Sequence, residues 1–154
     1  MFFKKKTTGR YTIEESSFSE VVVYWCRYLW PNRDSEIEDV SYINSSGNID
    51  LSMQPKDKIY LVAKKNDASK EVIGVISGHS SSQNEYRVRG VWVSEDWRKQ
   101  GLGSDLLKQL ILRIPKKKYS HIWVMPRQQV MLFYENNNFF VQKEVTQYEF
   151  GPHY

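Results

Sequence analysis

The stretch Val91-Trp-Val-Ser-Glu-Asp-Trp-Arg-Lys-Gln-Gly-Leu-Gly-Ser104, followed by Asp105-Leu-Leu107, decides how this chain of 154 residues is organised. It predicts an apolar strand, a tight turn and then a helix. The N–H groups at a helix start have no partners within the helix and carry the positive end of its dipole, so they attract phosphate. Gly101 and Gly103 let the backbone approach an anion closely. The stretch therefore predicts a site for a phosphorylated ligand.

The spacing of the turn separates it from two other phosphate loops. A dinucleotide fingerprint needs a glycine where this chain has Leu106, and no Gly-Lys-Ser/Thr tripeptide of a Walker loop is present. Arg98-x-x-Gly101-x-Gly103 instead resembles the pyrophosphate loop of the GCN5-related N-acetyltransferase (GNAT) family, which binds the diphosphate of acetyl-coenzyme A. An ordinary strand-to-helix turn is the alternative for so short a pattern. The resemblance implies cofactor contacts from Val91, Trp92, Val93, Arg98, Lys99, Gln100, Gly101, Leu102, Gly103 and Ser104.

A second motif, Tyr134-Glu-Asn-Asn-Asn-Phe139, resembles the family's Tyr-Glu-x-x-Gly-Phe box. Asn138 replaces the glycine, which suits a position with positive φ because Asn tolerates it. The resemblance implies that Tyr134 is the general acid that protonates the leaving thiolate; a tyrosine packed in the core is the alternative. Arg127 stands where family members often carry an asparagine that contacts the cofactor, so we expect Arg127 to hydrogen-bond it. No metal is expected.

The hydrophobic periodicity predicts an α/β fold with the order β-α-α-β-β-β-α-β-α-β. A capping box at Ser35 and Glu38 predicts the second helix. The other expected elements are helices over Phe18–Leu29, Gly101–Ile114 and Gln128–Glu135, strands over Ile59–Ala63, Glu71–Ser77, Tyr86–Val93 and His121–Met125, a turn over Gly78–Asn84, and closing strands over Phe139–Thr146 and Tyr148–Phe150. This order is similar to the family's fold, a central mixed, mostly antiparallel sheet flanked by about four helices. We expect one such domain over residues 1–154.

Composition limits the class of protein without choosing the function. A hydrophobic fraction of 40% predicts a globular chain. The lone Cys26, which we expect in the core, cannot form an internal disulfide, which is typical of a reducing cytoplasm. No apolar run approaches the roughly 18 residues of a membrane span, so we expect a cytoplasmic protein without membrane contact. The net charge of +4 indicates an anionic partner only weakly.

The general base and the acceptor are less well defined. Ile122 stands where some family members carry a glutamate, and strand alternation turns His121 to the other face. His79 and Glu85, expected on a turn, could act through water, or the amine could arrive deprotonated. The acceptor is a small-molecule or peptide amine. The segment from Trp25 to Pro31 resembles part of some aminoglycoside 6′-N-acetyltransferases, and the acidic residues that follow favour a cationic amine: Asp34, Glu36, Glu38 and Asp39. Two of these acids could instead stabilise the start of the expected helix.

The expected function is therefore transfer of an acetyl group from acetyl-coenzyme A to a primary amine by direct attack, in a monomer or homodimer. Two other hypotheses remain open. A protein of the same fold could bind acyl-coenzyme A as a sensor without turnover. A nucleic-acid module could use the basic charge with Tyr86, Trp92 and Trp97. Nucleic acid is the weaker hypothesis, because 18 acidic residues are interspersed along the chain.

Overall fold

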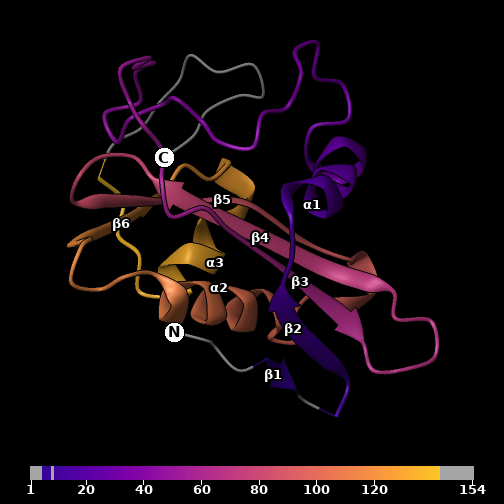
Figure 1. The fold of residues 1–154 in the computed structure, drawn as a ribbon. Coiled ribbons are helices and arrows are strands. Elements are labelled where there is room, and N and C mark those ends of the chain that lie inside the picture. Colours follow the sequence, from indigo (N-terminus) through magenta and orange to yellow (C-terminus); the bar gives the residue numbers. More distant parts are fainter. Residues whose placement is uncertain (1–4, 8, 143–154) are drawn as a thin grey trace.

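A computed structural model describes residues 5–7 and 9–142. One six-stranded sheet has its strands in chain order, and all neighbours are antiparallel except β5 and β6, which are parallel (Figure 1). The strands are β1 (Lys6–Thr7), β2 (Tyr11–Glu15), β3 (Ile59–Lys65), β4 (Val72–Ser80), β5 (Glu85–Val93) and β6 (His121–Val124). The parallel pair follows from the crossover that carries a helix between β5 and β6.

The helices cover both faces of the sheet (Figure 1). They are α1 (Phe18–Tyr24), α2 (Leu102–Arg113) and α3 (Met131–Asn136), with a π-helical turn η1 (Trp25–Leu29) and two 3-10 turns, η2 (Glu95–Trp97) and η3 (Gln128–Val130). The helix α1 packs on one face through Val21, and η1 continues that contact through Trp25. The helices α2 and α3 pack on the other face.

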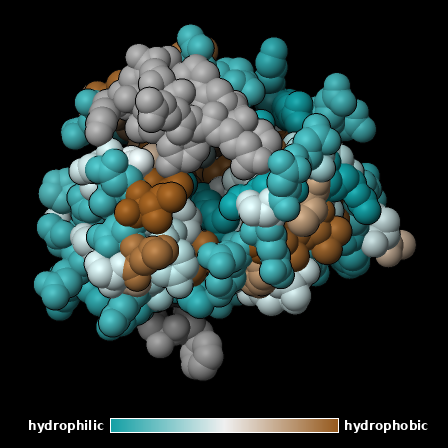
Figure 2. All heavy atoms as spheres, turned by 90° about the horizontal axis from the view of Figure 1, so that it is seen from above, coloured by the Kyte–Doolittle hydropathy of each residue, from teal (hydrophilic) through white to brown (hydrophobic). Residues whose placement is uncertain are grey.

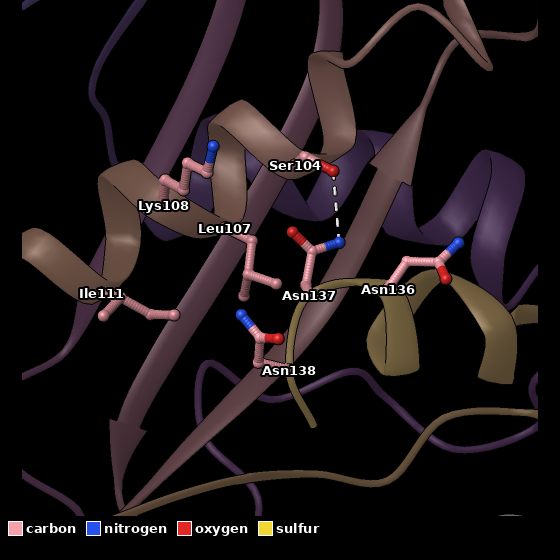
Figure 3. Close-up of a pocket in the computed structure, with 7 residues that line it drawn as sticks. All are labelled: Ser104, Leu107, Lys108, Ile111, Asn136, Asn137 and Asn138. Carbon is pink, nitrogen blue, oxygen red and sulfur yellow. Dashed lines mark hydrogen bonds between the residues drawn. The ribbon is translucent and has the colours of Figure 1, made fainter. Parts of the chain in front are cut away.

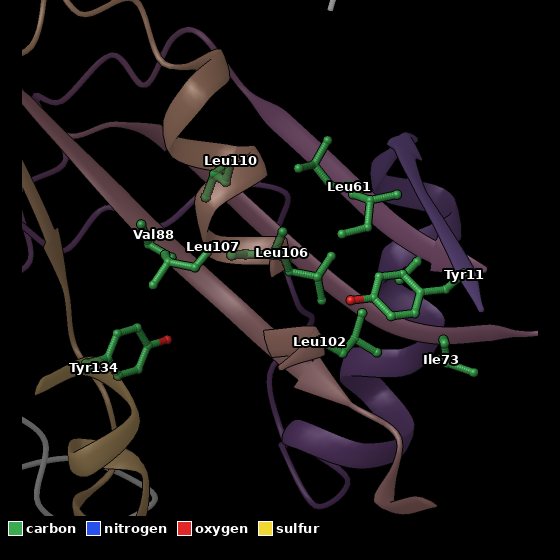
Figure 4. Close-up of a cluster of buried hydrophobic side chains, with 12 residues drawn as sticks. Tyr11, Leu61, Ile73, Val88, Leu102, Leu106, Leu107, Leu110 and Tyr134 are labelled. Atoms are coloured by element: carbon green, nitrogen blue, oxygen red, sulfur yellow. The ribbon is translucent and has the colours of Figure 1, made fainter. Parts of the chain in front are cut away.

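The leucines of α2 form the centre of the larger core, as their spacing predicts (Figure 4). Leu102, Leu106, Leu107 and Leu110 are all about fully buried, against side chains of β2 to β5. Full burial of one leucine stabilises a fold by about 1.5–3 kcal/mol. This stripe therefore holds the helix that follows the glycine turn firmly against the sheet.

The helix predicted from the capping box at Ser35 is wrong, so the described residues contain three α-helices and not about four. The Ser35 hydroxyl accepts a hydrogen bond from Nε of Arg33 at 2.8 Å, so it does not cap a helix. Ile37 and Val40 are buried instead, and the Arg89 guanidinium of β5 donates a hydrogen bond to the Glu38 carbonyl at 2.8 Å. Tertiary contacts hold this segment in a non-helical conformation, and they outweigh its local preference for helix.

Other boundaries also differ from the prediction. The helix from Phe18 becomes π-helical at Trp25. The strand β4 extends to Ser80, so the expected turn begins late. Residues 139–142 are not in a strand, and the rest of the two expected closing strands lies outside the described residues.

The surface shown in Figure 2 carries exposed apolar side chains in separate patches, divided by polar ones. Large exposed apolar residues of the described chain include Ile49, Leu51, Leu132 and Phe140. Among residues 5–7 and 9–142, no helix has the length and hydropathy to cross a membrane.

Candidate active site

The turn between η2 and α2 ends at a helix start whose first N–H groups have no side-chain cap. Lys99 and Gly101 have φ of 59° and 87°, so both lie in the left-handed region. The first hydrogen bond of α2 runs from the Asp105 N–H to the Gly101 carbonyl at 3.0 Å, so the N–H groups between them have no acceptor within the helix. Gly101 is the N-cap residue. It has no side chain that could accept hydrogen bonds from these N–H groups, as serine or aspartate would. This helix start is open to an anion.

Charges of both signs lie at the turn: Arg98 and Lys99 are basic, and Glu95 and Asp96 precede them in η2. Arg98 is exposed, and its Nε donates to the Val93 carbonyl at 3.0 Å. Asp105 lies in the first turn of α2, where its charge would repel an anion, but Lys6 pairs with it at 2.6 Å and the Tyr11 hydroxyl donates to it. Burial acts to raise the pKa of Asp105, and these two bonds outweigh it, so the pKa lies below its usual value.

The two glycines of the motif are needed for different reasons. Gly101 has open space around it and is required by its positive φ. At Gly103 an added Cβ would lie 3.1 Å from the Phe133 ring, so this glycine lets α3 approach α2. Gly103 thus also serves the packing of α3 against α2, and the expected approach of its backbone to an anion stays a prediction.

Beside the turn, β5 parts from β6. Their parallel pairing runs from Glu85 and His121 to Val88 and Val124, and β5 then continues to Val93. Within the described residues the later part of β5 has no strand partner on this side. Such an edge binds an extended ligand that supplies its own amide groups.

Tyr134 lies in α3 with 6% of its surface exposed, and its ring meets the edges of Phe133 and Phe139. Its hydroxyl points away from α3 in Figure 4. Burial raises the pKa of this phenol above its usual value of 10.0. Asn138 has a φ of 68°, which confirms the expected positive φ at the glycine position of the box.

Arg127 is the N-cap residue of η3, and its side chain extends to η1. Its guanidinium donates to the Leu29 carbonyl, at the end of η1, at 2.6 Å. Burial lowers the pKa of Arg127. The side chain therefore joins the β6–α3 connection to the α1 side of the sheet.

The residues considered as a general base lie away from the turn. His79 was expected on a surface turn, and this is wrong. It lies within β4 and is 1% exposed. Its Nε2 accepts from the Ser41 N–H at 3.1 Å, its Nδ1 lies 2.9 Å from the Ser80 carbonyl, and burial lowers its pKa to about 4. Glu85 accepts from the Ser45 hydroxyl at the opposite end of β5, about 26 Å from Val93 at 3.3 Å per residue.

Two further expectations are settled by burial. His121 is exposed while Ile122 packs against the α2 cluster, so the two residues face opposite sides as alternation predicts. Cys26 is exposed on η1, so the expectation that it lies in the core is wrong. The π-helical geometry of η1 shifts the positions after Trp25 away from the α-helical stripe.

A hollow of about 440 Å³ lies between α2 and the end of α3 (Figure 3). The amide of Asn137 donates to the Ser104 hydroxyl at 3.2 Å, so this hollow adjoins the open start of α2. Its lining is polar on both sides and consists of Ser104, Leu107, Lys108, Ile111, Asn136, Asn137 and Asn138. In the part of the chain that the structure describes, no group of three His, Cys, Asp or Glu side chains could hold a metal ion.

The sequence of residues 22–139 matches the Acetyltransferase (GNAT) family, and the chain belongs to this family. No curated protein sequence is similar enough to match. Solved structures with a similar fold include a putative acetyl transferase from Pyrococcus furiosus, with a TM-score of 0.65, 12% identity and coverage of 90% of this chain and 98% of that one. Glucosamine-6-phosphate N-acetyltransferase from Arabidopsis thaliana has a TM-score of 0.61, 13% identity and coverage of 90% and 98%.

A third similar structure is the aminoglycoside acetyltransferase meta-AAC0020 from an uncultured soil metagenomic sample. It has a TM-score of 0.61, 14% identity and coverage of 90% of this chain and 93% of that one. At such identities these likenesses show a shared fold.

Proposed function

We propose that the protein transfers an acetyl group from acetyl-coenzyme A to a primary amine by direct attack. The observation that carries this proposal is the open N-terminus of α2 beside the unpaired edge of β5. The turn from Arg98 to Ser104 binds the diphosphate, and the Val91–Val93 backbone binds the pantetheine arm as an added strand would. The hollow beside Ser104, with Lys108 on its wall, offers room for the nucleotide end.

The reaction needs no covalent bond to the protein. The amine nitrogen attacks the thioester carbonyl, a C–N bond forms, and the carbonyl oxygen becomes an oxyanion that backbone N–H groups of β5 stabilise. Collapse of this intermediate breaks the C–S bond, the thiolate takes a proton from Tyr134, and the phenolate regains a proton from water. The proton of the amine passes to water. Because burial raises the pKa of Tyr134, its hydroxyl holds its proton at neutral pH.

The acceptor approaches from the α1 side of the sheet, opposite α2, in this proposal. The segment after η1 carries three exposed acidic residues, Asp34, Glu36 and Glu38. Asp39 differs from them because Lys58 pairs with its carboxylate at 2.7 Å. A cationic amine is the acceptor class that this arrangement favours.

The test measures release of free thiol from acetyl-coenzyme A with a panel of amines, together with the melting temperature. We expect turnover with at least one amine, and stabilisation by acetyl-coenzyme A. Stabilisation without thiol release from any amine would support a sensor. Absence of both thiol release and stabilisation would contradict cofactor binding.

The loop assignment has a matched control. Gly101→Val and Gly47→Val each force a β-branched residue into a positive φ, of 87° and 83°. Both should lower the melting temperature of the free protein. Only Gly101→Val should lose stabilisation by acetyl-coenzyme A, and equal stabilisation of both variants would contradict the loop assignment.

A further inference from the structure

A β-bulge lies in β5 where the strand leaves β6. On β4, Val75 pairs with Trp92 and Ser77 pairs with Arg89, so two residues of β5 oppose the single residue between them. The first of these two, Gly90, has a φ of 65°. A glycine in the left-handed region is the usual first residue of one class of bulge, which bends a strand and increases its twist.

Side chains replace the backbone bonds that the bulge disrupts. The Ser77 hydroxyl donates to the Arg89 carbonyl at 2.9 Å, and the Trp25 indole N–H donates to the Gly90 carbonyl at 2.8 Å. Ser77 is 1% exposed and Trp25 is fully buried. Since a buried carbonyl without a donor is costly, these two side chains hold the bulge in its conformation.

The contact between Trp25 and Gly90 admits no other residue at position 90. A Cβ there would lie 2.3 Å from Nε1 and Cε2 of the indole. The indole is itself held on its other sides, by the edge contact with Trp30 at 5.5 Å and by the Arg89 guanidinium 4.9 Å from its ring. Trp25 also begins the π-helical turn, a feature often found at functional sites.

The position of the bulge connects it to the reaction. Pairing between β5 and β6 ends at Val88, directly before Arg89 and Gly90, and the proposed cofactor edge begins directly after them at Val91. The bulge thus sets the direction of the Val91 peptide. Trp25, on the α1 side of the sheet, holds the bulge.

We propose that Trp25 is a positioning residue for acetyl transfer: its indole N–H fixes the bulge that aims the Val91–Val93 backbone at the thioester carbonyl. Trp25 does not contact the reacting atoms. This inference rests on the proposed function, because it assigns a role to the edge of β5 in that reaction. It implies that loss of the indole N–H, with an aromatic ring retained at the position, slows chemistry more than it weakens cofactor binding.

Trp25→Phe and Trp123→Phe form a matched pair for the test. The first removes the bond to Gly90, and the second removes an indole bond of 2.7 Å to the Ser81 hydroxyl, on β6 away from the bulge. We expect kcat of Trp25→Phe to fall about 10- to 100-fold, the range for a displaced reactive group. Its KM for acetyl-coenzyme A should change little, and the Val91 amide should exchange with deuterium faster. Trp123→Phe should keep the wild-type kcat.

The outcomes separate the inference from the function on which it rests. A Trp25→Phe protein with wild-type kcat, or with a loss that Trp123→Phe shares, would overturn the positioning role and leave the proposed function intact. A rise in KM for acetyl-coenzyme A with an unchanged kcat would also overturn it. A wild-type protein that neither binds nor uses acetyl-coenzyme A would overturn the proposed function, and the inference with it.

Discussion

At the scale of single residues, Tyr134 combines a buried ring with a hydroxyl that burial keeps protonated. Tyr134→Phe removes one oxygen atom and keeps the aromatic contacts with Phe133 and Phe139. We expect this variant to retain the fold and cofactor binding, and to lose about 10²-fold in turnover, the lower end for a missing proton donor. Thiol release at saturating acetyl-coenzyme A measures it.

The pH profile gives a control for the same residue. Because the raised pKa keeps the phenol neutral through pH 9, ionisation of Tyr134 should not produce an alkaline fall in kcat below that pH. Turnover of Tyr134→Phe equal to wild type would return the tyrosine to a purely structural role in the core.

His79 gives a prediction for stability. Its pKa in the folded protein, about 4, lies below the value near 6.5 of an unfolded chain, so the unfolded state takes up the proton first as the pH falls. The stability held by neutral His79 is complete above about pH 6.5 and is lost towards pH 4, by up to about 3 kcal/mol at 1.36 kcal/mol per pKa unit.

Urea unfolding from pH 7 to pH 4.5 checks this prediction. His79→Gln has no group that titrates there, so its stability should vary less with pH than that of wild type. Carboxylates with lowered pKa that do not act on His79, such as Asp57 and Asp105, contribute equally to both proteins and cancel in the difference. Parallel curves for the two proteins would contradict the assignment.

At the scale of elements, the sequence predicted best what one periodicity decides. The leucines of α2 recur with a helical period and bury one face of the helix. The apolar runs rich in β-branched residues predict the buried strands β3 and β4. The capping box at Ser35 gave a wrong prediction, because its signal is local. The conformation is decided by the burial of Ile37 and Val40 and by the bond from the Arg89 guanidinium of β5.

The bulge in β5 shows which part of the site could not be predicted. The residues of the turn from Arg98 to Ser104 follow one another in sequence, so their motif was visible. Gly90 gave a weak signal, since an isolated glycine within a strand pattern suggests a bulge. Its partner Trp25 lies 65 residues earlier and looked like one more apolar position of a helix. Only the fold brings such a pair together.

At the scale of the whole molecule, the sheet separates two approaches to the end of β5. The helices α2 and α3 lie on one face with the turn from Arg98 to Ser104, and α1, η1 and the segment after them lie on the other (Figure 1). Arg127 joins the two sides through the Leu29 carbonyl. An acceptor on the α1 side and a cofactor on the α2 side would therefore meet at the edge of β5.

The acidic segment on the α1 side leads to the last prediction. Asp34, Glu36 and Glu38 are exposed, whereas Lys58 already neutralises Asp39. If these three carboxylates attract the acceptor, Asp34→Asn/Glu36→Gln/Glu38→Gln should raise KM for a polyamine or aminoglycoside severalfold and leave kcat unchanged, because they lie outside the chemistry. Asp39→Asn is the matched control and should change KM little.

Ionic strength and substrate choice complete the test. The difference in KM should shrink as salt rises from 0.01 M to 0.15 M, since the Debye length falls from about 30 Å to about 8 Å. A competition among a polyamine, a peptide N-terminus and a neutral amine should favour the polyamine. Preference for the neutral amine or the peptide, with KM unaffected in the triple variant, would contradict the prediction. The acceptor would then be recognised by other groups of the protein, and the acidic segment would be only solvated surface.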